Sequence, residues 1–400
     1  MTTADGTVIG TTKILDNGTP SRRWNLVLMG DGYQTTQMGQ YANDAQRFVD
    51  TLIATPPFDV LQEAINVYRV DVTSTDSGAD DPTGCGGPGT TARTYFDASF
   101  CNSGIRRLLV ANSGTALGLA AAQVPEWHMI MVIVNSTVYG GSGGSIAVYS
   151  LAPGAEEIAL HEMGHTAFGL ADEYEYFAGC GVDTDRNNHP GVEPAEPNVT
   201  TNSNRSTIKW RYFILPTTPV PTTSNPNCTQ CDPRTGPPPP LPADVVGAFE
   251  GAHYFHCGAF RPQFNCRMRA LNNGFCAVCQ DRIVETLTPF LPPSIELAAG
   301  QTQPGLGWQQ YLGGSGIFID VDTSSGKFDM TPRYITSLGG NTSHWRTTGG
   351  TSIYSPTPMG FRVYVRWADG APLTPANATA LGWRVNWIGL SSGSVSGSGV

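Results

Sequence analysis

The chain has 400 residues, carries a formal net charge of −10 at pH 7, and contains only 14% charged residues. Its length is enough for two domains with sizeable cores, whereas an acidic balance without any lysine- and arginine-rich run excludes a nucleic-acid-binding surface. No apolar run has the length of a transmembrane helix, which excludes a membrane span.

Strands and helices alternate over the first 150 residues. Residues 23–33 (RWNLVLMGDGY) form an apolar run that ends in a glycine turn, as buried strands do. Met38, Tyr41, Ala45 and Phe48 then recur at helical spacing. A strand, a helix and two further strands are predicted at residues 64–72, 104–124, 128–135 and 143–151. This alternation predicts a mixed α/β domain.

The next predicted helix, residues 154–168 (GAEEIALHEMGHTAF), carries a metal-binding spacing. His161 and His165 are four residues apart, so both imidazoles lie on one helical face and can reach a single zinc ion. Glu162 follows the first histidine, where a carboxylate acts as the general base of a zinc peptidase. Gly169 stands where the helix can end in a left-handed residue. A structural helix that merely contains two histidines is the less favoured interpretation.

A catalytic zinc needs a third protein ligand and one open position. In the metzincin pattern this ligand lies six residues after the second histidine and follows a glycine at the third. Here the glycine, Gly169, is fourth and the seventh residue is Asp172, so the three-residue step from glycine to ligand is retained. Asp172 is therefore the predicted third ligand. Glu173 is the main alternative, because a small change of backbone path would present it instead, and His189 is a further candidate.

Residues 180–245 show little periodicity and many prolines, which predicts irregular structure held by cysteines. Nine cysteines in a weakly charged chain favour disulfides and an oxidising compartment. Cys85 and Cys101 enclose a glycine-rich loop and are expected to pair. The CTQC (Cys228–Cys231) and CAVC (Cys276–Cys279) segments allow a structural zinc site, but disulfides are favoured, with one cysteine left unpaired. The chain begins without a signal peptide, so secretion would use a trimmed leader or a leader-independent route.

The C-terminal part has a different pattern. Residues 293–302 are interpreted as a linker, and the short β-rich runs of residues 303–391 predict an all-β sandwich. These runs weakly resemble lectin-type modules, which makes glycans a candidate partner. Trp345 is the aromatic expected to stack on a sugar, and Trp387 is expected in the core. The tail, residues 392–400, is expected to be flexible.

The segment HEMGHTAFGLADEYEY resembles the signature of the IgA-peptidase family of bacterial zinc metallopeptidases. Three further segments are similar, LMGDGYQTTQM, RVDVTSTDSGADDP and FRPQFNCRMRALNNGFCAVCQ, so the likeness covers roughly residues 8–290. The resemblance implies a metzincin-like domain with endopeptidase activity, and Met268 as a Met-turn beneath the zinc. It also implies an edge strand at residues 143–151 that pairs with an extended substrate. From the residues alone, Met268 is an ordinary core methionine, and an interior strand is equally favoured.

These observations predict an α/β (α+β) metzincin-like zinc peptidase domain over residues 1–292, followed by the all-β sandwich. The expected function is a secreted zinc endopeptidase that cleaves protein or peptide substrates, with Glu162 as general base and His161, His165 and Asp172 as ligands of one Zn2+ ion. An additional Ca2+ ion at the acidic segment DSGADDP (Asp76–Pro82) is unsupported by any ligand spacing. The alternative is a non-catalytic adhesin or carbohydrate-binding protein that retains a metallopeptidase fold.

Overall fold

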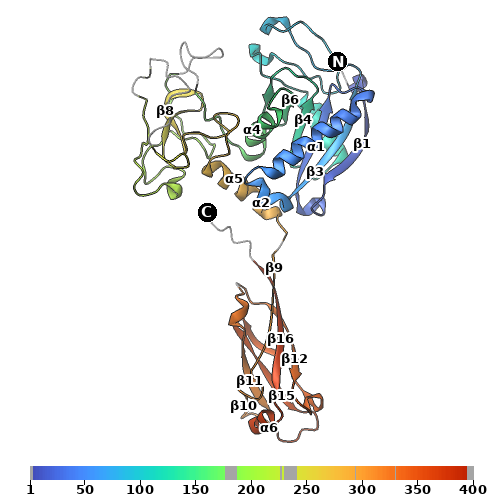
Figure 1. Ribbon diagram of the computed structural model, residues 1–400, viewed down its shortest axis with the longest axis vertical. Coiled ribbons are helices and arrows are strands. Elements are labelled where there is room, and N and C mark those ends of the chain that lie inside the picture. Colours follow the sequence, from blue (N-terminus) through green and yellow to red (C-terminus); the bar gives the residue numbers. More distant parts are fainter. Residues whose placement is uncertain are drawn as a thin grey trace. The chain divides into compact units, whose positions relative to one another are not determined.

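The computed structural model describes residues 3–175, 187–225, 228, 241–292, 294–328 and 330–393. The chain divides into two compact units, Met1–Leu291 and Pro292–Val400 (Figure 1). Within the described ranges, no helix is both long and apolar enough to cross a membrane. Cys180 and Cys231, for which disulfides were also predicted, lie outside the described part of the chain.

A six-stranded sheet forms the centre of the first unit, in the order β1-β3-β2-β4-β6-β5. Its strands are β1 (Gly6–Leu15), β2 (Trp24–Asp31), β3 (Ile65–Ser74), β4 (Met129–Val134), β5 (Gly141–Ser142) and β6 (Ala147–Ser150). The four inner strands are parallel, and the two edge strands β1 and β5 run antiparallel to their neighbours. Strands β2, β4 and β6 are mostly apolar because both faces of the sheet are covered there, whereas β3 also carries the partly exposed ion pair Arg69–Asp71.

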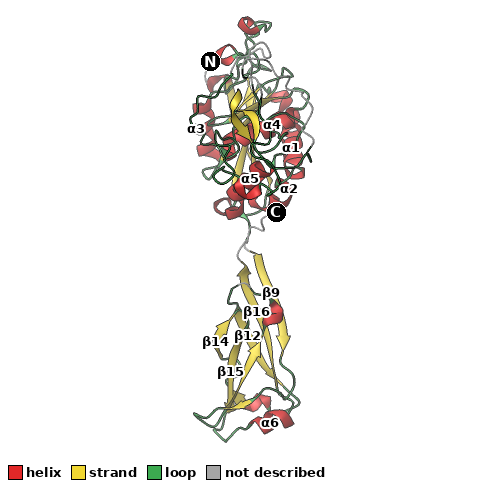
Figure 2. Cartoon of the chain, turned by 90° about the vertical axis from the view of Figure 1, so that its left-hand side faces the viewer, coloured by secondary structure: helices red, strands yellow, loops and turns green. Residues whose placement is uncertain are grey.

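Helices cover both faces of this sheet, which makes three layers (Figure 2). On one face lie α1 (Met38–Ala54), α4 (Ala155–Phe168), the short α2 (Phe58–Leu61) and α5 (Ala277–Leu287), and on the other lies α3 (Ser113–Gln123). In strand β2, successive side chains point to opposite faces of the sheet and so belong to different core clusters. Leu26 and Leu28 join the cluster with α1 and α4, and Val27 and Met29 join the cluster with α3.

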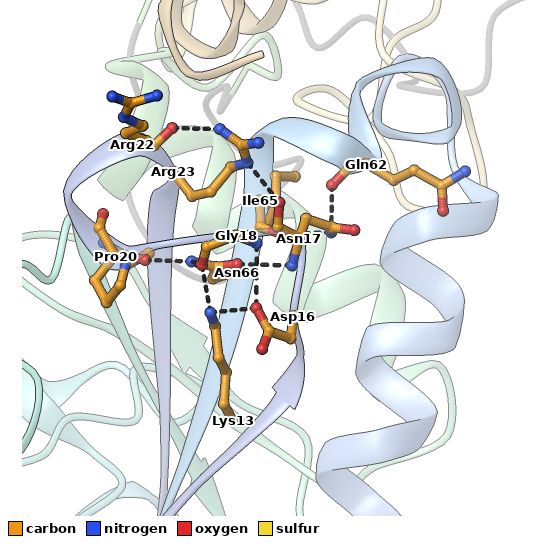
Figure 3. Close-up of polar contacts among 11 residues, drawn as sticks. Lys13, Asp16, Asn17, Gly18, Pro20, Arg22, Arg23, Gln62, Ile65 and Asn66 are labelled. Carbon is orange, nitrogen blue, oxygen red and sulfur yellow. Dashed lines mark hydrogen bonds and ion pairs between the residues drawn. The ribbon is translucent and has the colours of Figure 1, made fainter. Parts of the chain in front are cut away.

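The turn between β1 and β2 is fixed by side-chain amides (Figure 3). Asn17 Nδ2 donates to the carbonyls of Gln62 and Ile65 at 2.8 and 2.7 Å, where β3 begins. Asn66 Oδ1 accepts from the Asn17 backbone N–H at 2.9 Å, and Asn66 Nδ2 donates to the Gly18 carbonyl at 3.1 Å. The loop thus has its backbone groups paired, as a partly buried connection requires.

Two expectations for this unit need correction. The helix predicted over residues 104–124 begins only at Ser113, because the Asn112 side chain accepts from the Thr115 N–H and caps it there. Strand β1 was not predicted. Residues 143–151 contain β6, which is buried between β4 and β5, so this segment is an interior strand and β5 is the edge.

The region after α4 has little regular structure, as expected. It contains one hairpin, β7 (Phe249–Ala252) and β8 (Phe255–Arg261), among the described residues. Isolated bridges attach the loops to it, including Glu175 with Tyr254 and Thr200 with Phe260. The hairpin therefore serves as the scaffold for the segment that follows α4.

The second unit consists of two antiparallel sheets around one apolar core. One sheet contains β10 (Gln309–Gln310), β11 (Ile317–Asp322), β13 (Thr347–Thr348), β14 (Ile353–Thr357) and β15 (Gly360–Trp367). The other contains β12 (Arg333–Gly339), β16 (Arg384–Gly393) and β9 (Ser294–Gln301), and a short helix, α6 (Pro375–Ala380), precedes β16. Trp387 is buried and Trp345 is 79% exposed.

The interpretation of residues 293–302 as a linker is wrong. Residues Ser294–Gln301 form β9, which pairs with β16 over its whole length. The start of the expected tail is also too early, because Ser392 and Gly393 belong to β16, and residues 394–400 lie outside the described chain. Ile295 and Leu297 of β9 are 72% and 67% exposed, so these apolar side chains lie outside the core of the second unit.

Candidate metal centre

Helix α4 presents two histidines to a common point. It begins after Gly154 and ends at Gly169, both in the left-handed conformation with φ of 81° and 62°. The Nε2 atoms of His161 and His165 lie 3.1 Å apart. The i, i+4 spacing therefore brings the two ring nitrogens together as predicted.

The chain after Gly169 returns a carboxylate to the same point. Asp172 Oδ1 lies 3.1 Å from His161 Nε2 and 3.2 Å from His165 Nε2. Asn198 holds this return in place, because its side-chain amide bonds both the N–H and the carbonyl of Ala171 at 2.8 and 2.9 Å. The structure thus brings together the three residues predicted as ligands.

Both imidazole rings are oriented through their Nδ1 atoms. His161 Nδ1 lies 3.1 Å from the Arg267 carbonyl, and His165 Nδ1 lies 2.7 Å from the Leu170 carbonyl. A carbonyl can only accept, so each Nδ1 carries the proton and each Nε2 presents a lone pair. Carbonyl partners of this kind are the usual outer contacts of metal-binding histidines.

The three converging atoms are all acceptors, and this fits a cation. With both Nε2 atoms unprotonated, Asp172 Oδ1 is buried and has no hydrogen-bond donor among the described residues. Without a cation at this point, the same contacts would draw a proton onto the rings instead: burial opposes a protonated His165, but Asp172 outweighs it and raises the pKa of that ring to about 9. Two imidazole nitrogens and a carboxylate oxygen form a donor set typical of zinc.

Asp172 has a second contact that fixes its orientation. Tyr254 Oη donates to Asp172 Oδ2 at 2.5 Å, which leaves Oδ1 directed at the histidines. The turn that carries Tyr254 is tied to the same segment, because the His253 N–H donates to the Asp172 carbonyl at 3.0 Å. Tyr254 and His253 both have positive φ, 72° and 54°, a conformation that costs free energy and is concentrated at functional sites.

Glu162 lies beside the histidines on the face of α4 that meets β5. A Cβ atom on Gly141 would be 3.0 Å from Glu162 Oε1, and one on Gly143 would be 3.3 Å from Oε2. Burial raises the pKa of the Glu162 carboxyl. A carboxylate with a raised pKa next to a metal-binding group can exchange protons with a reacting molecule.

These side chains open into a cleft of about 590 Å³. It is lined by Ile105, Arg107, Leu108, Gly141, Ser142, Gly143, Gly144, His161, Glu162, His165, Gly169, Leu170, Asp172, Tyr174, Glu196 and Tyr254. The edge strand β5 forms one wall of the cleft, and the segment after α4 forms another. A molecule bound along β5 would therefore pass over Glu162.

The two alternative ligands lie elsewhere. Glu173 Oε1 accepts from Asn198 Nδ2 at 2.9 Å and lies 3.4 Å from Cys279 Sγ, so its carboxylate belongs to a different cluster. His189 Nε2 lies 3.1 Å from His253 Nδ1 and is not among the residues that gather with His161.

Met268, which the resemblance implied as a Met-turn, packs against α4 at Gly164. Its Sδ atom would be 2.6 Å from a Cβ on Gly164, so only glycine lets α4 approach it this closely. Met268 is fully buried. Its backbone carbonyl accepts from the Glu173 N–H at 2.8 Å, which joins this loop to the segment that carries Asp172.

The cysteines only partly follow the prediction. Cys85–Cys101 forms a disulfide as expected, and Cys228 pairs with Cys257. The disulfides favoured for the CAVC segment are wrong, because Cys276 and Cys279 are free, as is Cys266. Sequence spacing could not show this, since the third thiol comes from a separate loop. Tyr254 and Asn198 were also missed, and no local pattern marks either residue.

A model of the family described as IgA Peptidase M64 matches residues 12–230 and 241–287. A comparison with curated proteins finds no match. The matched ranges include α4, Asp172, the β7–β8 hairpin, Met268 and all of α5.

Proposed function

Because the chain belongs to the IgA peptidase M64 family and is thus a peptidase, we propose that it is a zinc-dependent endopeptidase acting on protein substrates. The observation that carries this proposal is the meeting of His161 Nε2, His165 Nε2 and Asp172 Oδ1 beside Glu162 in one open cleft. The three groups would hold the ion and leave a position for a small molecule.

A bound zinc ion would supply Lewis-acid polarisation of the scissile carbonyl and activation of the attacking water. Glu162 takes the proton of that water and passes it to the leaving amine. The raised pKa of Glu162 brings its proton affinity closer to that needed for both steps. Tyr254 and the carbonyls of Arg267 and Leu170 keep the ligands in place.

Strand β5 gives the cleft a means of aligning a peptide. It pairs with β6 on its inner side, and on its outer side Gly141 forms an isolated bridge with Leu108, with the Gly141 N–H donating to the Arg107 carbonyl at 3.2 Å. An extended substrate would therefore pair by β-augmentation with the backbone beyond this bridge, at Gly143. The glycines at 141 and 143 bring this edge close to Glu162, so a peptide bound there has its backbone beside the general base.

Secretion and the role of the second unit belong to the same proposal. The disulfides Cys85–Cys101 and Cys228–Cys257 favour an oxidising compartment. The exposed Trp345 is the side chain that a glycan would stack on if the second unit binds carbohydrate. A non-catalytic binding protein would have no use for Glu162 beside the three ligand groups.

The test is Glu162→Gln in the full chain, assayed by digestion of a peptide library. Hydrolysis should fall by about 10²- to 10⁴-fold, because general acid–base catalysis is lost, while bound zinc and the unfolding temperature stay unchanged. Glu156→Gln is the matched control, because Glu156 is on the same helix but pairs with Arg47. A chelator should abolish hydrolysis by the wild type, and zinc should restore it. Full activity of Glu162→Gln would refute the proposed role.

A further inference from the structure

Three cysteines and one glutamate meet inside the first unit, and none of them belongs to the histidine cluster. They are Cys266 in the Met268 loop, Cys276 and Cys279 at the start of α5, and Glu173 next to Asp172. All four side chains are at most 3% exposed, and their ligand atoms lie within 4.8 Å of one another. We propose that these four residues hold a second, structural zinc ion.

The separations between the atoms are those of tetrahedral zinc. Sulfur ligands at ~2.3 Å and an oxygen ligand at ~2.0–2.2 Å place two sulfurs about 3.8 Å apart and a sulfur about 3.6 Å from an oxygen. Cys266 Sγ and Cys279 Sγ are 3.8 Å apart. Glu173 Oε1 lies 3.7 Å from Cys276 Sγ and 3.4 Å from Cys279 Sγ. Four ligands close the site, as in structural rather than catalytic zinc centres.

Backbone donors point at the sulfur atoms, and one carboxylate oxygen of the cluster has no partner among the described residues. Backbone N–H groups of Cys276 and Cys279 point at sulfur, at 3.3 Å from Cys266 Sγ and 3.4 Å from Cys276 Sγ. Such donors and the N-terminus of α5 stabilise thiolates. Glu173 Oε2 is buried without a hydrogen-bond partner among the described residues. A divalent cation would offset the cost of burying these groups together.

A disulfide does not account for the cluster. A disulfide needs an S–S distance of ~2.03–2.05 Å, whereas Cys266 Sγ and Cys279 Sγ are 3.8 Å apart. With three thiols, one disulfide would also leave one cysteine and the Glu173 carboxylate buried together. Zinc uses all three thiols and the carboxylate.

The second ion would hold together the segments that build the first site. Glu173 directly follows Asp172 in the chain, and its N–H donates to the Met268 carbonyl. Cys266 precedes Arg267, whose carbonyl orients His161. The four ligands therefore join the Asp172 segment, the Met268 loop and α5, and they position the catalytic residues without contacting substrate.

The decisive experiment isolates the second site by removing the first. The His161→Ala/His165→Ala double variant, purified from zinc-containing medium, should retain one equivalent of zinc per chain. Zinc-edge X-ray absorption should show a first shell dominated by sulfur at ~2.3 Å. A variant without zinc, or a shell of nitrogen and oxygen only, would overturn the proposal. Catalysis is not measured in this variant, so this test can fail while the proposed endopeptidase activity stands, and the reverse.

Cysteine variants give the complementary test. The wild type should bind two zinc ions, and Cys276→Ala/Cys279→Ala should lose one and unfold at lower temperature. Cys85→Ala/Cys101→Ala removes a disulfide elsewhere and should keep both ions. If the Cys276→Ala/Cys279→Ala variant does not fold, the oxidation state of the three cysteines can be tested in the wild type, by denaturing it without reductant and alkylating its free thiols. Mass mapping should find Cys266, Cys276 and Cys279 all as thiols, and a disulfide between any two would contradict the site.

Discussion

At the scale of single residues, Asp172 and Glu173 are neighbours whose side chains reach different clusters. The HExxH spacing predicts the histidines because one helix fixes their relation, and the step from Gly169 predicts Asp172 because the connection is short. Tyr254 lies 82 residues beyond Asp172 and the thiols come from two segments, so no local spacing marks either. Contacts between distant segments need the folded chain.

The hydrogen bond from Tyr254 to Asp172 gives a prediction at this scale. Tyr254→Phe should weaken zinc binding at the histidine site by about 10- to 100-fold, because the outer partner of a ligand is lost. Competition with a chromophoric chelator measures this change. Tyr212→Phe is the control, because Tyr212 is 83% exposed and distant in sequence from every ligand. Equal zinc affinity in both variants would show that Tyr254 does not support Asp172.

At the scale of elements, the contact between β5 and α4 sets the shape of the cleft. The apolar runs predicted β2, β4 and β6 because inner strands are buried on both faces. They could not identify β5, a two-residue strand that approaches α4 through Gly141 and through Gly143 directly after it. The position of β5 at the sheet edge depends on the order of the strands in the sheet, and this order could not be predicted from the sequence.

Gly143 tests this contact. A Cβ atom there would be 2.7 Å from His165 Cβ, so Gly143→Ala must move the strand edge or the helix face. Peptide hydrolysis should fall by about tenfold or more, because small displacements of reacting groups are costly. Gly118→Ala in α3 is the control, since its Cβ would meet nothing within 4 Å. Unchanged kcat/KM in Gly143→Ala would show that close approach is not needed.

The loop that carries Glu193 predicts a dependence of stability on pH. Partial burial raises the pKa of Glu193, but hydrogen bonds from Thr200, Lys209 and Thr201 outweigh it and lower the pKa to about 2. A lowered folded-state pKa means that these contacts stabilise fully above about 4.5 and are lost as pH falls towards 2.

Glu193→Gln should therefore lower the free energy of unfolding at pH 6 by no more than about 1 kcal/mol, because the side chain is 41% exposed and solvent screens the contacts. The difference from wild type should shrink between pH 4.5 and pH 2. Denaturant unfolding at several pH values measures this difference. A constant difference across the range would mean that the carboxylate charge plays no part.

At the scale of the whole molecule, the chain consists of two compact units, and the sequence separates their patterns better than it locates their boundary. Proline and glycine around residues 293–302 suggested a linker, but β9 is there. Its partner β16 begins at Arg384, so only long-range pairing identifies it. The division of the structure falls at Leu291 and Pro292.

This boundary gives a prediction about folding. A fragment of residues 292–400 should unfold cooperatively in denaturant, because it contains β9 and both sheets. A fragment of residues 302–400 should be much less stable or unfolded, since β16 loses its partner over the length of β9. Circular dichroism measures both fragments. Equal stability would show that β9 is not part of the folded unit.

The central claim is that His161, His165 and Asp172 are the protein ligands of the catalytic zinc. An anomalous-difference map from a crystal measured at the zinc edge tests it most directly. We predict a peak at the point where the two Nε2 atoms converge, with an Asp172 oxygen at ~2.0–2.2 Å from it. A peak bonded to Glu173 or His189, with Asp172 beyond ~3 Å, would contradict the claim.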